Sequence, residues 1–259
     1  MRSCVSSPSP SELPPPGSLR DAGTPLHLDE QSPLPASWAL AGVLAAVHVV
    51  SAVGWSVVRP RPLWVALLFD RPRAMRAGVG GQVDRLLEDG EWWRLATSCL
   101  LHADIVHLTL NAVSLVALGR LLEPLVGGWR LLAWFVLGGL GGSLTSWAAG
   151  FRYSDGASGG AFALLGAIAV IGWMERSHTL KEDQQLFGPV LWVFLAGNVV
   201  LSFLLPFIDV AGHLGGLAVG LMLGLWPGRR PGPPAWVDGV LVVAFLAVCA
   251  GGWGLLLSS

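Results

Sequence analysis

The sequence predicts an all-α, polytopic membrane protein, and three observations support this fold class. Hydrophobic residues make up 53% of the 259 residues and charged residues only 13%, whereas a soluble domain is about 25% charged. The mean hydropathy is +0.61, and the chain contains seven apolar runs, each close to the ~20 residues that cross a bilayer core. The 34 glycines suit closely packed membrane helices, and the 13 tryptophans suit anchoring at the membrane interface.

Charge and cysteine usage exclude several other classes of protein. The formal net charge of −1 argues against a nucleic-acid-binding module. Cys4, Cys99 and Cys249 lie far apart and match neither a zinc motif nor a disulfide framework. We therefore exclude a soluble enzyme, a disordered regulator and a secreted disulfide scaffold, and we expect no metal and no cofactor.

Residues 1–35 form a polar segment with a different composition from the rest. Eight of the 18 prolines fall here, among serines and scattered charges, so the segment has too little apolar surface to order itself. Its acidic residues stand where a signal peptide would have basic ones, and the apolar run that follows is too long for a signal peptide. We predict a disordered tail at 1–35 and a first membrane helix at 36–58.

Six further spans are predicted by length and hydropathy. They lie at 104–123, 129–150, 157–174, 188–206, 210–226 and 235–257. The spans that begin near 104, 157 and 210 are more polar than the others. Because ionisable groups inside a membrane are costly, such residues mark candidate functional sites. The long connection 59–101 is rich in Arg and Trp, and we expect it to be partly structured and partly at the membrane interface.

The distribution of Lys and Arg favours a cytoplasmic N-terminus, although the long connection weakens the argument. With the N-terminus inside, the short inner segments hold eight basic residues against one outside. Including the long connection makes the totals equal. The frequent use of Ala, Gly, Pro, Arg and Leu suggests a GC-rich bacterial gene. We therefore expect a multi-pass protein of a bacterial plasma membrane.

His107 and Asn111 form the first polar group at membrane depth. Because they are four residues apart on a predicted helix, their side chains share one face about one turn apart. Both side chains can donate hydrogen bonds. The alternative is that the two polar residues merely hold neighbouring helices together.

Ser158 forms the second group, within the sequence GASGG at the start of an apolar run. The adjacent glycines allow another backbone to approach, and a helix start leaves unpaired amides that can stabilise an oxyanion. The alternative is an ordinary capping or packing serine.

His213 forms the third group and shares one helical stripe with Gly216, Gly220 and Gly224. Glycines at this spacing allow a neighbouring helix to pack backbone to backbone. If that neighbour carries Ser158, the two side chains come within hydrogen-bond reach. The alternative is a buried structural histidine.

Together the three groups make a complete hydrolytic site. A histidine base activates a serine nucleophile, while donors from another helix and the serine's own amide stabilise the oxyanion. Asp209 lies one turn before His213 but near the expected membrane edge. The residues therefore favour a Ser–His dyad over a triad.

These motifs resemble those of the rhomboid family of intramembrane serine proteases. GASG around Ser158 resembles the nucleophile motif, and GHLGG around His213 resembles the general-base motif. HLTLN, from His107 to Asn111, resembles the H-x-x-x-N oxyanion motif. By this resemblance Ser158 and His213 are the catalytic residues, and His107, Asn111 and the Ser158 amide form the oxyanion hole.

Two further matches lie in the long connection. WWRLAT resembles the family's tryptophan–arginine motif, with Trp93 and Arg94, and His102 resembles a histidine that precedes H-x-x-x-N. The resemblance covers residues 36–226. It implies a core of six helices around a water-filled cavity and a first loop embedded in the outer leaflet. Residues 227–259 are then a linker and a seventh membrane helix.

The resemblance also implies the partners. The family cleaves single-pass membrane proteins in or near their membrane segment, so we expect such substrates and the lipid bilayer as partners, and no nucleic acid. The oligomeric state and the physiological substrate stay open.

One residue departs from the family pattern. Phe162 stands where some members have tyrosine; its ring can still stack on His213, but it has no hydroxyl.

Two other functions remain as alternatives. An inactive rhomboid-like binding protein would usually lack the serine or the histidine, and both are present here. A transporter often shows internal repeats, and none is evident in this sequence.

Overall fold

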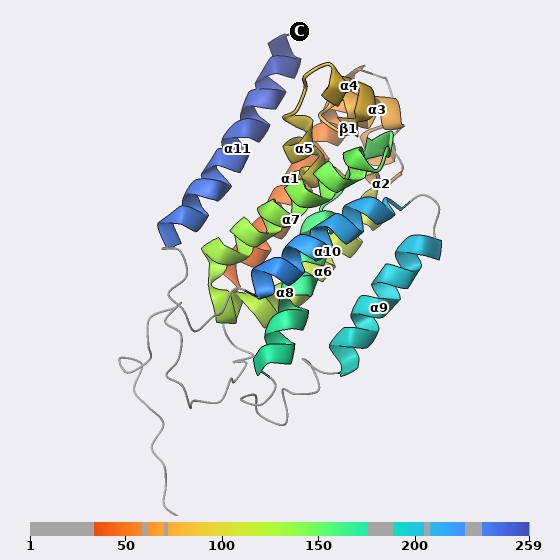
Figure 1. Ribbon diagram of the computed structural model, residues 1–259. Coiled ribbons are helices and arrows are strands. Elements are labelled where there is room, and N and C mark those ends of the chain that lie inside the picture. The colour runs from red at the N-terminus through yellow and green to blue at the C-terminus, as the bar shows by residue number, and fades with distance from the viewer. Residues whose placement is uncertain are drawn as a thin grey trace, which may run out of the picture.

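The computed structural model describes residues 34–58, 62–69, 72–175, 189–204, 208–225 and 235–258. Most of this part is helical, and seven long helices pack into a bundle (Figure 1). They are α1 (Pro35–Val58), α6 (Ile105–Val126), α7 (Gly128–Ala148), α8 (Ser158–Glu175), α9 (Pro189–Leu204), α10 (Val210–Gly224) and α11 (Ala235–Ser258). The predicted disordered tail lies almost entirely outside the described residues, and the predicted linker before α11 lies wholly outside them.

The seven helices coincide with the seven predicted spans, and each end falls within three residues of its predicted position. Four of them, α1, α6, α7 and α11, are long and apolar enough to cross a membrane by themselves, whereas α8, α9 and α10 are shorter apolar helices. The chain is therefore a polytopic helical membrane protein.

The centre of the bundle consists of α8, α10 and α7, which pack closely against one another. From Ala161 to Val170 every residue of α8 is buried, so this helix lies inside the protein. At one edge α11 packs against α7, and at the opposite edge α9 packs against α10 and α8 (Figure 1). The start of α8, which carries Ser158, lies next to α7 and α10.

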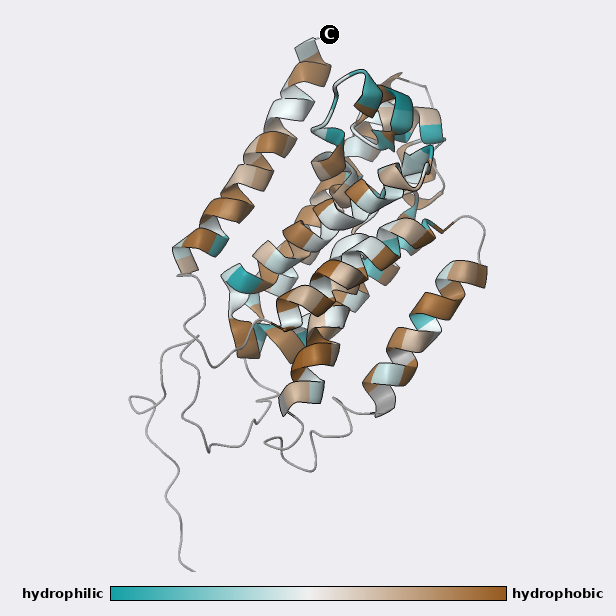
Figure 2. Ribbon diagram, in the orientation of Figure 1, coloured by the Kyte–Doolittle hydropathy of each residue, from teal (hydrophilic) through white to brown (hydrophobic). Residues whose placement is uncertain are grey.

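The described parts of the connection between α1 and α6 form short elements, which confirms that it is partly structured, while its predicted place at the membrane interface stays a prediction. Its elements are α2 (Leu63–Leu68), α3 (Arg73–Gly78), β1 (Gln82–Val83), α4 (Asp84–Glu88), α5 (Arg94–Thr97) and a 3₁₀ turn (Ser98–Leu100). Polar residues gather on these elements at one end of the bundle (Figure 2). Strand β1 pairs antiparallel with β2 (Tyr153–Ser154), which joins the connection to the segment just before α8.

A buried carboxylate joins α6 to the start of α1 at the other end of the bundle. Glu123 accepts hydrogen bonds from the amides of Ala36 and Ser37, at 2.9 and 3.0 Å, and from the Ser37 hydroxyl. These amides belong to the first turn of α1, whose positive dipole end favours a carboxylate. Glu123 therefore fixes α1 against α6.

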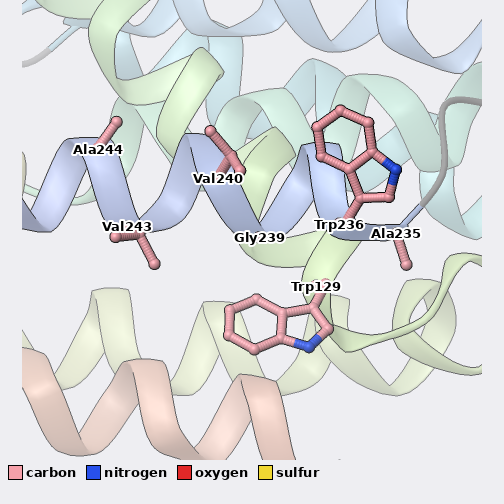
Figure 3. Close-up of a pocket in the computed structure, with 7 residues that line it drawn as sticks. All are labelled: Trp129, Ala235, Trp236, Gly239, Val240, Val243 and Ala244. Atoms are coloured by element: carbon pink, nitrogen blue, oxygen red, sulfur yellow. The ribbon is translucent and has the colours of Figure 1, made fainter.

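An apolar hollow of about 610 Å³ lies between the start of α7 and the start of α11 (Figure 3). Trp129 lines it from α7, and Trp236 with other small or apolar residues lines it from α11. This end of α7 is the one opposite to the segment that leads to Ser158. The hollow is therefore separate from the polar residues singled out in the sequence.

Candidate active site

Ser158 and His213 lie within hydrogen-bond distance of each other. Ser158 is the first residue of α8, and His213 lies in the first turns of α10. The distance between His213 Nε2 and Ser158 Oγ is 2.8 Å. Both residues are partly buried.

Glycines on α10 bring the two helices together. A Cβ atom on Gly216 would overlap the backbone of Gly159, and one on Gly220 would overlap the backbone of Ala163. Gly224 continues the same contact one turn further along α8, against Ala167. The spacing of the glycine stripe predicts a closely packed neighbour, and the structure shows that this neighbour is the helix of Ser158. The packing places the histidine beside the serine.

The imidazole of His213 stacks on the ring of Phe162. The ring centroids are 4.3 Å apart and the planes are inclined by 20°. Phe162 is one turn after Ser158 on α8 and is buried. An aromatic ring without a hydroxyl is therefore sufficient for the stacking that the resemblance implies.

Asp209 does not hydrogen-bond the imidazole in the arrangement described. Its carboxylate caps α10 by accepting the amide of Gly212 at 2.8 Å, and it also accepts the hydroxyl of Ser154 at 2.7 Å. Asp209 thereby fixes the start of α10 against the segment that precedes Ser158.

The second ring nitrogen of His213 contacts a residue that the sequence analysis did not single out. Ser202 Oγ, from α9, lies 2.7 Å from His213 Nδ1. No sequence signal marked this residue, because a single serine in an apolar run has no pattern that distinguishes it from a packing residue.

His107 lies close to Ser158. A Cβ placed on Gly156 would be 2.9 Å from His107 Nε2 and 3.8 Å from Ser158 Oγ, so the imidazole occupies the side of Gly156 where a side chain would stand. Gly156 has a φ of +129°, a conformation that other residues rarely adopt. The same glycine therefore permits both the local backbone conformation and the close approach of the His107 ring.

The other two polar residues near His107 are buried. Asn111 donates its side-chain amide to the His107 carbonyl at 3.0 Å. The ring of His102 meets the ring of His107 edge to face, with centroids 5.0 Å apart. These contacts place both residues beside His107, and the Asn111 amide has a second N–H that this hydrogen bond does not use.

Trp93 and Arg94 lie in the connecting segment rather than at the dyad. Arg94 donates to the carbonyls of Ala77 and Gly81 and pairs with Glu91 at 2.8 Å. Its guanidinium lies over the Trp93 ring, at 4.5 Å from the centroid. These contacts indicate that the pair holds the connecting segment in shape.

The connecting segment is in turn attached to the segment that leads to Ser158. Arg76 pairs with Asp155 at 2.6 Å, and the amide of Gly156 donates to the carbonyl of Ser98 at 3.0 Å. Because Ser158 follows within three residues of Asp155, this ion pair and hydrogen bond limit where Ser158 can lie.

The fold and the site define a polytopic helical membrane protein with a serine and a histidine paired between two closely packed helices. The rhomboid domain model matches residues 89–230, more than half of the chain. The chain therefore belongs to the rhomboid family.

Several curated proteins are similar to this chain over its central part. RHOMBOID-like protein 5 of Arabidopsis thaliana is 38% identical over 156 residues, which cover 59% of this chain and 50% of that protein. Rhomboid protease GluP of Bacillus subtilis is 34% identical over 141 residues, 54% of this chain and 27% of that protein. Inactive rhomboid-related protein 2 of Caenorhabditis elegans is 34% identical over 173 residues, 61% of this chain and 49% of that protein. The chain thus spans half or less of each of these relatives.

Proposed function

We propose that the chain is an intramembrane serine endopeptidase that cleaves single-pass membrane proteins in or near their membrane segment. The observation that carries the proposal is the 2.8 Å contact between His213 Nε2 and Ser158 Oγ. A serine becomes a nucleophile when a base accepts its proton, and this distance allows that transfer. Family membership supports the reaction class, since relatives include a protein named as a rhomboid protease.

The proposed reaction uses the dyad twice. Ser158 Oγ attacks the scissile carbonyl carbon while His213 takes the hydroxyl proton. His213 then gives this proton to the leaving amine, which leaves an acyl group on Ser158. Water repeats the attack with His213 as base, and the acid product and the free serine result. His107, Asn111 and the Ser158 amide are the proposed donors to the oxyanion of each tetrahedral intermediate.

The competing proposal is an inactive member that binds membrane proteins without cleaving them. One relative is named as inactive, so family membership alone does not decide between the two. The deciding measurement is labelling of the purified protein by a fluorophosphonate, which reacts with activated serines. We expect wild-type protein to be labelled and Ser158→Ala to remain unlabelled. An unlabelled, folded wild-type protein that also fails to cleave a generic rhomboid substrate would favour the inactive alternative.

We expect Asn111→Ala to lower kcat/KM by roughly 100-fold or less, the lower end of the loss when one oxyanion donor is removed. The loss is limited because His107 and the Ser158 amide can still donate. Thr109→Ala is a suitable control, since Thr109 lies on the same helix, is exposed and bonds its own helix at Ile105 O. Equal turnover of Asn111→Ala and the control, in a quantitative cleavage assay, would remove Asn111 from the oxyanion hole.

We also propose that the N-terminus lies on the cytoplasmic side of a bacterial plasma membrane. The basic residues of the short loops support this orientation. Reporter fusions that are active on one side of the membrane test it when placed before α1 and after α11. The fusion before α1 should report the cytoplasmic side, and a report from the other side would contradict the proposed orientation. With seven crossings, the fusion after α11 should report the opposite side. Reports from the same side would contradict the seven-span topology.

A further inference from the structure

The imidazole of His213 has a hydrogen-bond partner on each ring nitrogen. Nε2 lies 2.8 Å from Ser158 Oγ on α8, and Nδ1 lies 2.7 Å from Ser202 Oγ on α9. Ser202 is 3% exposed, so water does not compete freely for its hydroxyl. The histidine is therefore held between serines from two different helices.

The proton on Ser202 has a defined place. Ser202 Oγ lies 2.8 Å from the carbonyl oxygen of Asn198, which is four residues earlier on α9. A carbonyl only accepts hydrogen bonds, and a serine hydroxyl has one hydrogen to donate. When Ser202 donates that hydrogen to Asn198, its oxygen can only accept from His213.

This hydrogen-bond arrangement selects one tautomer of His213. The proton must then be on Nδ1, which donates to Ser202, and Nε2 is left with a free lone pair toward Ser158. In the other tautomer Nε2 carries the proton and points it at Ser158 Oγ, so the ring cannot accept the serine's proton. The Ser202 hydroxyl would also leave the Asn198 carbonyl to donate to Nδ1. The tautomer with the proton on Nδ1 keeps all three hydrogen bonds: Ser158 donates to Nε2, Nδ1 donates to Ser202, and Ser202 donates to the Asn198 carbonyl.

We propose that Ser202 is a positioning residue that holds His213 in the tautomer able to act as a base. The inference rests on the proposed function, because a base is needed only if Ser158 is a nucleophile. Ser202 fills, as a neutral hydroxyl, the place that a carboxylate has in a Ser–His–Asp triad. It also makes the position of α9 matter for the reaction, although α9 carries neither member of the dyad.

We expect Ser202→Ala to lower kcat by about 10- to 100-fold with KM little changed, the range found when the hydrogen-bond partner of a metal-binding histidine is removed. Ser202→Thr should recover most of the rate, because a threonine hydroxyl can also bond the carbonyl four residues earlier. Ser51→Ala is the matched control, since Ser51 is a buried serine that bonds its own helix at His48 O on α1. Thermal unfolding of all three variants shows whether the rate changes come from lost folding.

The tautomer itself is observable by ¹⁵N NMR of histidine-labelled protein, where the protonated and bare ring nitrogens differ in chemical shift. We expect wild-type His213 to be protonated at Nδ1 and Ser202→Ala to show a mixture or the reverse. If the wild-type protein cleaves no substrate but its His213 spectrum still differs from that of Ser202→Ala in the expected way, the proposed function fails and the role of Ser202 in selecting the tautomer stands. If wild type is active and Ser202→Ala has the same kcat and the same His213 spectrum, the role of Ser202 is wrong and the dyad stands.

Discussion

Replacing Ser158 with alanine is expected to reduce cleavage by about 10⁶-fold, the order of loss in a soluble serine protease when its nucleophile is removed. The substitution removes one oxygen atom and leaves α8 otherwise unchanged, so folding should be retained. His213→Ala should cost about as much, because serine without a base is a poor nucleophile. Cleavage of a fluorogenic membrane substrate in detergent and in vesicles measures both losses.

The double variant is the sharper test of a shared mechanism. Because a nucleophile and its base act as one unit, Ser158→Ala with His213→Ala should be no slower than either single variant. Losses that multiply would mean that the two residues contribute separately. His213→Ala also removes the contacts to Phe162 and Ser202, so unfolding temperature must be compared with that of Ser158→Ala. Retained cleavage in His213→Ala alone would point to another base.

The helices and the glycine contact could be predicted because their signals are repetitive. A span of apolar residues has the length of the bilayer, and glycines at a four-residue spacing mark one face of a helix. That face predicts a closely packed neighbour but does not say which helix it is. With α8 as the neighbour, Ser158 and His213 come within hydrogen-bond distance. The fold class could thus be predicted from the sequence, whereas the choice of Ser158 and His213 as a pair also needed the resemblance to the rhomboid family.

The remaining features have no repeating signal. β1 and β2 are two residues long and pair across about 70 residues of sequence, with Gln82 opposite Ser154. The ion pair between Arg76 and Asp155 is likewise a contact between single residues on distant segments. Ser202 is one serine in an apolar helix, and its role depends on how α9 packs against α10. Such contacts depend on tertiary packing, which periodicity does not encode.

Gly220→Val is expected to cause the second large loss, at least about 100-fold in kcat, because a misplacement of 1 Å in a catalytic group has an effect of that order. A Cβ atom at this position would overlap the carbonyl oxygen, the carbonyl carbon and the Cα atom of Ala163. Those are backbone atoms, so the overlap cannot be relieved by a change of rotamer. α10 must move away from α8, and His213 moves with it, away from Ser158.

The matched control for Gly220→Val is Gly42→Val on α1, where a Cβ would meet no heavy atom within 4 Å. It makes the same chemical change on an exposed helix face and should leave turnover unchanged. Gly220→Ala should fall between the two, because it adds one carbon where valine adds three. Rates are expressed per folded protein, since forcing atoms into a packed interface also costs about 1–3 kcal/mol of stability.

The graded series separates lost geometry from lost folding. If Gly220→Ala and Gly220→Val lower kcat per folded molecule in the order of their size, and fluorophosphonate labelling falls in parallel, the helix contact sets the distance between nucleophile and base. If both variants simply unfold at lower temperature but keep full turnover while folded, the contact stabilises the bundle without aligning the dyad. Full turnover and unchanged stability in Gly220→Val would contradict the backbone contact between α8 and α10.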